Sequence, residues 1–117
     1  MVVKIKNLGW SMSAKDDLKS IALYYKKKVS ITSSIQIIHE LRTDAQSLLE
    51  TPMIGRVEPL INDDINPLVS DGIVIYRYII SGHYKIVYYI AQDTIWIARI
   101  FECRQSPVNQ KHLLNKQ

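Results

Sequence analysis

The apolar positions in the C-terminal part of the chain form three runs separated by short polar breaks. The runs read IVIYRYII, HYKIVYYI and TIWIARIFECR within residues 73–104, and the breaks fall at Ser81-Gly82 and at residues 91–93. Nearly every position in the runs is β-branched or aromatic, which favours strands, and such short breaks are typical of hairpins. The pattern predicts a three-stranded antiparallel meander.

Apolar and polar residues alternate at the N-terminus over a short stretch. Val3 and Ile5 alternate with Lys4 and Lys6, and Trp10 follows as a closing aromatic residue. Alternation of this kind indicates a half-buried strand. We therefore predict a strand within residues 2–11, joined to an edge of the meander.

The next two segments carry apolar residues at helical spacing. The first helix is predicted to begin at Ser13, with Asp16 in its first turn, and to end at the lysines 26–28. The second is predicted to be capped within residues 32–34 and to run to about Glu50. The short link predicts an antiparallel hairpin that packs on one face of the sheet. The predicted apolar stripes consist of Ala14, Leu18, Ile21, Ala22, Tyr25, Ile35, Ile38, Leu41, Ala45, Leu48 and Leu49.

Proline and glycine punctuate the part of the chain between the second helix and the meander. Pro52 stops the helix, and residues 51–59 are predicted to form a loop in which Gly55 supplies a positive φ angle. Residues 58–72 are predicted to form an irregular connection whose acidic residues Asp63, Asp64 and Asp71 can pair with cations of the sheet. These elements predict one α+β domain over residues 1–107, followed by a tail over residues 108–117.

Composition narrows the class of protein. The chain has 117 residues, of which 47% are hydrophobic and 22% are charged, and its formal net charge is +4. This is enough for one domain with one core, and it excludes global disorder. The mild positive excess suits nucleic acid or an acidic protein as a partner.

Several kinds of site and location are not indicated by the sequence. No apolar run reaches the roughly 20 residues of a membrane-spanning helix, and the start MVVKIKNLGW lacks the features of a secretory signal. We therefore expect a cytoplasmic protein with no membrane partner. Cys103 is the only cysteine, and His39, His83 and His112 show no ligand spacing, so we expect no metal and no cofactor.

The predicted sheet carries four cations: Arg77, Lys85, Arg99 and Arg104. Any one of them is explained by solvation or an ion pair, but together they favour a basic surface that binds an anionic partner. Strand parity predicts which residues share a face of the sheet with Arg77, Lys85, Arg104 and Cys103. It groups Arg77 with Ile75 and Ile79, Lys85 with Val87 and Tyr89, Arg104 with Trp96, Ala98, Ile100 and Glu102, and Cys103 with Ile95, Ile97 and Phe101.

The order of these elements and several residues resemble the RelE/ParE superfamily of toxins from type II toxin-antitoxin modules, also known as plasmid stabilisation systems. The resemblance covers nearly the whole chain, and its ending Arg-Gln-x-Pro and strand Tyr-x-Ile-x-Tyr are closer to ParE-like members. The residues that carry it are Trp10, Ala14, Asp17-Leu18, Ile21, Tyr24-Tyr25, Pro52-Met-Ile-Gly55-Arg56, Arg77, Tyr84-Lys85-Ile86-Val87-Tyr88 and Arg104-Gln105-Ser106-Pro107.

The resemblance implies two helices packed on an antiparallel sheet, and a cognate antitoxin that wraps the toxin and blocks its working surface. In a ParE-like toxin this surface binds DNA gyrase and blocks replication, so no catalytic residue is required. The binding residues expected under this interpretation are Arg77, Lys85, Arg104 and the tail.

Two alternatives remain open. A RelE-like toxin is an endoribonuclease that cuts messenger RNA on the ribosome, which requires a base, a phosphate-stabilising cation and an acid. The resemblance then implies Lys85, Arg104 and His112 as the catalytic residues. The second alternative is a remnant of this fold that is no longer toxic and only binds an antitoxin.

Overall fold

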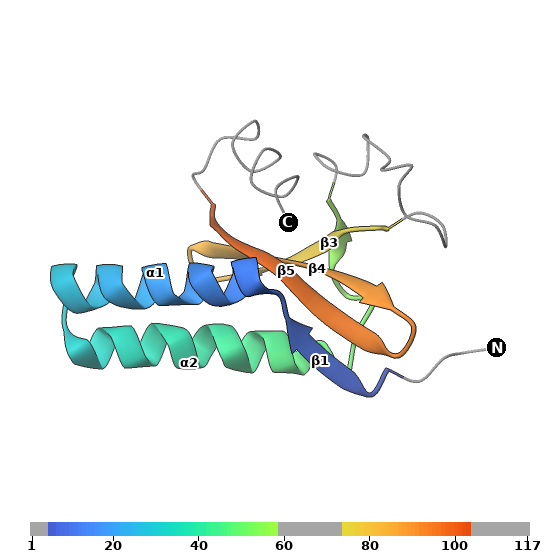
Figure 1. The fold of residues 1–117 in the computed structure, drawn as a ribbon, viewed down its shortest axis with the longest axis horizontal. Coiled ribbons are helices and arrows are strands. Elements are labelled where there is room, and N and C mark those ends of the chain that lie inside the picture. Colours follow the sequence, from blue (N-terminus) through green and yellow to red (C-terminus); the bar gives the residue numbers. More distant parts are fainter. Residues whose placement is uncertain (1–4, 59–73, 104–117) are drawn as a thin grey trace.

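The computed structural model describes residues 5–58 and 74–103, which form two layers (Figure 1). One layer is a hairpin of two helices, and the other is a five-stranded sheet in the order β1-β5-β4-β3-β2. The α+β fold predicted from the sequence is confirmed. The elements are β1 (Asn7–Trp10), α1 (Met12–Lys28), α2 (Ile31–Ser47), β2 (Arg56–Val57), β3 (Arg77–Ser81), β4 (Tyr84–Ala91) and β5 (Thr94–Glu102).

The predicted meander is present as β3, β4 and β5, which pair antiparallel in chain order. Gly82 and Gln92 have positive φ angles, of 59° and 57°, at the two hairpin turns. The N-terminal strand lies at the edge of the sheet, as predicted, and runs parallel to β5, with Asn7 opposite Thr94 and Trp10 opposite Ile97.

At the other edge, β2 corrects the prediction of a plain loop over residues 51–59. Two of these residues, Arg56 and Val57, pair antiparallel with β3. So short a strand leaves no alternation to read in a sequence. The predicted contacts of Asp63, Asp64 and Asp71, and the predicted tail, lie outside the described residues.

Both helices begin earlier than the sequence predicts. Ser11, not Ser13, is the N-cap of α1, and its hydroxyl accepts a hydrogen bond from the Ala14 N–H. Ser30 caps α2 in the same way, ahead of the predicted residues 32–34. Each run of closely spaced serines and threonines offers several possible caps, and the first serine in an extended conformation is the one used.

The two helices bury most of the predicted stripes against the sheet. The interior on this side contains Ala14, Leu18, Ile21, Leu41, Ala45, Leu48, Tyr84, Ile86, Tyr88, Ile95, Ile97 and Ile100. Ile35 is an exception, because 67% of it is exposed. It lies near the start of α2, where the helical hairpin extends beyond the sheet (Figure 1).

A bulge in β5 overturns the faces predicted for its second half. Val87 lies opposite Arg99 and Tyr88 lies opposite Ile97, so the register shifts here and Ala98 is the extra residue on β5. An extra residue reverses the alternation beyond it. Ile100 therefore packs on the helix side, not with Ala98 as predicted.

The same bulge corrects the prediction for the end of the strand. Phe101 packs on the sheet face opposite the helices, whereas Ile95 and Ile97 pack on the helix side. Cys103, predicted as a core residue, is exposed. The position of Arg104 lies outside the described residues.

Asp17 joins α1 to the sheet just after this bulge. Its carboxylate accepts hydrogen bonds from Arg99 Nε and Nη2 and from the Ile100 N–H, each 2.8 Å long. The side chains of Arg99 and Asp17 are only 13% and 14% exposed. Because β1 ends opposite Ile97, Asp17 occupies the strand edge that β1 leaves open.

We expect Asp17→Asn to lower the free energy of unfolding by about 1.5–3 kcal/mol, because the amide keeps one acceptor oxygen and loses the charge. Urea denaturation followed by circular dichroism measures this loss. Asp16→Asn is the matched control, since Asp16 is exposed on the same turn, and it should change the stability by less than about 0.5 kcal/mol. Equal effects of the two variants would contradict the role of Asp17.

Stability should also fall at alkaline pH. Burial raises the pKa of Tyr84 and Tyr88 above the ordinary value of 10.0, so the unfolded chain releases these protons at lower pH than the folded chain. The folded state binds more protons above pH 10, and stability therefore decreases as pH rises through that value. Urea midpoints at about pH 8, 10 and 11 should decrease in this order.

Tyr84→Phe removes one of these phenols, so it should make the alkaline loss of stability shallower. Tyr24→Phe serves as the control, because Tyr24 is 56% exposed. The same pH slope in Tyr84→Phe and in the parent protein would show that Tyr84 does not contribute.

Candidate binding surface

The sheet face opposite the helices has its own apolar cluster. Val87, Ala98 and Phe101 are buried there, and Tyr76, Tyr78 and Tyr89 pack against them. The rings of Tyr76 and Tyr89 meet edge to face at 5.6 Å. Burial is the main cause that raises the pKa of both these phenols, so neither is suited to act as a base near neutral pH.

Lys85 lies on this face and is engaged within the protein. Its Nζ is 2.6 Å from a carboxylate oxygen of Glu58, and the two side chains are 14% and 2% exposed. The Nζ also lies 4.7 Å from the centre of the Tyr78 ring. A buried ion pair of this kind holds its lysine in place, because either charge alone would be costly to bury.

Sequence reasoning missed the partner of Lys85. Glu58 follows β2 directly, and its N–H donates to the Tyr76 carbonyl at 2.8 Å, which fixes it beside the sheet. The segment it begins was predicted to be irregular. The only available signal was that a lysine among apolar strand residues requires a partner.

Arg77 lies on the helix side of the sheet, as strand parity predicts, and holds the loop before β2. Its Nη1 donates to the Gly55 carbonyl at 3.0 Å. The Tyr88 hydroxyl donates to the Pro52 carbonyl at 2.8 Å and accepts from the Gly55 N–H at 2.9 Å. These contacts fix the backbone of residues 52–55 against the sheet.

Gly55 is required for close approach and not for a special backbone angle. It is not among the glycines with positive φ, which corrects the prediction. A Cβ at this position would overlap the ring and hydroxyl of Tyr88. The absence of a side chain is what lets the loop backbone contact the tyrosine.

The fixed loop presents an apolar and basic surface, which we call the loop surface. Ile54 and Ile80 are 65% and 57% exposed, and Arg56 is exposed beside them. A shallow cavity of about 310 Å³ lies here, lined by Ile54, Arg56, Tyr78, Ile79 and Ile80. Exposed apolar residues grouped around a cation are characteristic of protein-binding sites.

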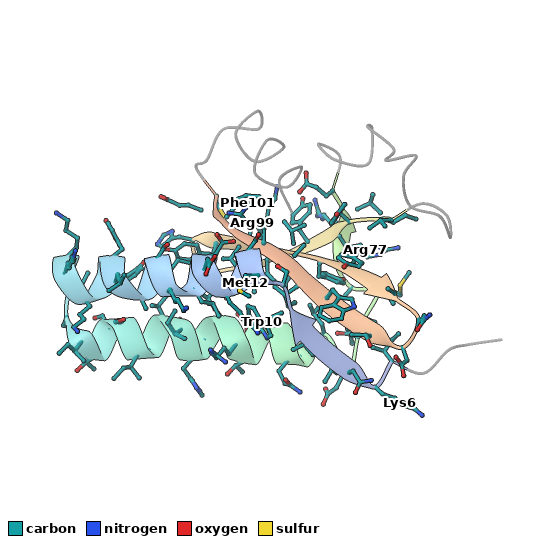
Figure 2. All side chains as sticks on the ribbon, in the orientation of Figure 1. Lys6, Trp10, Met12, Arg77, Arg99 and Phe101 are labelled. Carbon is teal, nitrogen blue, oxygen red and sulfur yellow. The ribbon has the colours of Figure 1, made fainter. Side chains whose placement is uncertain are left out.

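The two predicted site residues that the structure describes, Arg77 and Lys85, are not gathered in one place. Figure 2 shows Arg77 on the sheet and Arg99 near Phe101, at a distance from each other. Arg77 and Lys85 lie on opposite faces, while Arg104 and His112 lie outside the described residues. Within residues 5–58 and 74–103, no three His, Cys, Asp or Glu side chains are grouped so that they could hold a metal ion. No helix in this same part is long and apolar enough to cross a membrane.

Comparison with known proteins identifies the family and supports the fold of the chain. The family model for the ParE toxin of the type II toxin-antitoxin system, parDE, matches residues 8–107. Among solved structures, the chain is similar to one from a chromosomal ParDE TA system of P. aeruginosa, with a TM-score of 0.65 and 15% identity. The match covers 85% of this chain and 97% of that one. A search of curated proteins found no match.

The structural likeness at 15% identity shows the shared fold, and the family match extends over 100 of the 117 residues. The element order and the helical hairpin on the sheet agree with this family. The chain belongs to the ParE toxin family of type II toxin-antitoxin systems.

Proposed function

We propose that this protein is a cytoplasmic toxin that stops bacterial growth by binding DNA gyrase, and that a cognate antitoxin neutralises it. The family match over residues 8–107 carries the proposal. The structure supports a binding protein in a second way. The loop surface has the composition of a protein-binding site, and its backbone is fixed by Tyr88 and Arg77.

The nuclease alternative is less well supported by the geometry. It assigns Lys85 to catalysis, but the Lys85 ammonium is 2.6 Å from Glu58 and its side chain is 14% exposed. An ammonium held this way has to leave a buried carboxylate before it can reach a phosphate. A growth assay distinguishes the non-toxic remnant from the gyrase-binding toxin and from the nuclease, because only the remnant leaves growth unchanged.

The first test is a pulse induction of this chain alone in bacteria, with labelled thymidine and labelled methionine followed over the first minutes. We expect thymidine incorporation to fall first, because a block of gyrase stops replication. An earlier fall in methionine incorporation would indicate the nuclease instead. No fall in either label would indicate the non-toxic remnant. Co-expression of the antitoxin should restore both labels.

We further propose that the loop surface contacts the target. The predicted binding residues Arg77, Lys85 and Arg104 are not part of this surface, and a separate variant tests them. The double variant Ile54→Asp with Arg56→Ala should relieve growth inhibition at least tenfold, measured as surviving colonies after induction. Ile54 is 65% exposed, so the fold should be retained. Ile35→Asp is the matched control, since Ile35 is 67% exposed on the helical hairpin.

A second double variant, Lys85→Ala with Arg104→Ala, tests the predicted cations. Lys85→Ala also leaves Glu58 buried without its ammonium, so its thermal unfolding has to be measured beside its toxicity. Lost toxicity with unchanged unfolding would support the cations as binding residues. Full toxicity in both double variants would contradict the proposed surface.

A further inference from the structure

One face of the helical hairpin carries two rows of side chains that the proposed function does not use. Residues three or four positions apart share one face of a helix, and each row has this spacing. The row on α1, which we call the lysine row, consists of Lys15, Lys19, Ala22 and Lys26. The row on α2, which we call the isoleucine row, consists of Ile31, Ile35, Ile38 and Arg42.

The two rows lie beside each other across a cavity. The helices run side by side (Figure 1), and the Ser34 hydroxyl of α2 donates to the Ala22 carbonyl of α1 at 2.7 Å. This contact fixes one row against the other. The cavity between them is about 340 Å³, and its lining from the two rows consists of Lys15, Lys19, Ala22, Ile38 and Arg42. We call the surface formed by both rows the hairpin groove.

The isoleucine row is unusually accessible for its composition. Ile31 and Ile35 are 60% and 67% exposed, whereas Leu41, which faces the sheet from the same helix, is fully buried. Exposed aliphatic side chains arranged in a row beside a cavity are characteristic of a surface that a partner covers. The groove therefore has an apolar side to which an aliphatic row of a partner can pack.

The other side of the hairpin groove is basic. The cavity is lined by three cations and no carboxylate. Residues 18–39 contain four lysines and neither aspartate nor glutamate, so this stretch alone accounts for the net charge of +4. Within residues 5–58 and 74–103, the ion pairs are formed by Lys85 and Arg99, and none by the lysine row. The groove thus attracts negative charge along the side opposite the isoleucines.

We propose that the hairpin groove binds an acidic amphipathic helix of a partner protein. Its aliphatic side chains pack on the isoleucine row, and its carboxylates pair with the lysine row. Each row extends over about 16 Å, which matches about three turns of a bound helix. Nucleic acid would pair with the lysines but leave the isoleucines in water, and a second copy of this chain would bring like charges together.

The test is a titration of the isotopically labelled full chain with a synthetic helical peptide, followed by nuclear magnetic resonance. The peptide has about 18 residues, with leucine and glutamate in two adjacent rows at helical spacing. The amide signals of Lys19, Ala22 and Ile35 should shift and saturate. A peptide with glutamine in place of every glutamate should bind at least tenfold more weakly. Equal affinity for the two peptides, or no shift at these amides, would overturn the proposal.

Three further titrations test the class of partner. Duplex DNA and vesicles of phosphatidylglycerol should each bind more weakly than the glutamate peptide. Tighter binding of either one at the amides of the groove would overturn the assignment to a protein helix. Shifts of the same amides when the chain alone is concentrated would assign the groove to a second copy instead.

A matched pair of lysine variants separates local contact from general attraction. Lys19→Glu should weaken the glutamate peptide at least tenfold. Lys6→Glu changes the net charge equally but lies away from the helical hairpin (Figure 2), so it should weaken the peptide less than about threefold. Both lysines are exposed, and thermal unfolding should stay unchanged. Equal losses of affinity in the two variants would show that no contact is made in the groove.

The inference does not depend on the proposed function, because the linings of the two cavities share no residue. Ile35→Asp should weaken the peptide at least tenfold and keep growth inhibition. The double variant Ile54→Asp with Arg56→Ala should bind the peptide normally and lose growth inhibition. Unchanged peptide affinity in Ile35→Asp would overturn the groove, whereas growth inhibition retained in the double variant bears only on the proposed function.

Discussion

The carboxylate of Asp17 is the contact on which the arrangement of the two layers depends. It receives three hydrogen bonds from β5, two from the Arg99 guanidinium and one from the Ile100 N–H. These bonds compensate the desolvation of a charge pair that is nearly buried. They also fix the rotation of α1, so that Ala14, Leu18 and Ile21 face the sheet.

A cavity of about 330 Å³ lies beside Asp17, between α1 and the part of β5 beyond the bulge. The loop surface lies at the opposite edge of the sheet, where β2 pairs with β3. The loop surface and this cavity therefore lie on different parts of the molecule.

Much of the fold follows from local pattern, and the exceptions have physical causes. A run of β-branched and aromatic residues between two polar breaks located β4, and helical spacing located the buried face of α1, because both depend on residues close in the chain. The bulge at Ala98 could not be predicted from local pattern. Arg99 lies out of register there and binds Asp17, which is 82 positions away in the chain. The partner of Lys85 was missed for the same reason: Glu58 comes from a segment with no periodicity. The candidate site depends on such distant pairs more than the fold does, and for this reason its residues were only partly predicted.

The segment from Pro52 to Glu58 is held at both ends, by Tyr88 at one and by Lys85 and Tyr76 at the other. Its exposed side chains therefore project from a backbone whose conformation is already settled before any partner arrives. Ordering a loop on association costs conformational entropy, and little of that cost is left here. The loop surface is consequently suited to rigid docking, in which association is limited by the relative orientation of the two partners. A partner that is itself flexible would bear most of the entropic cost of the complex.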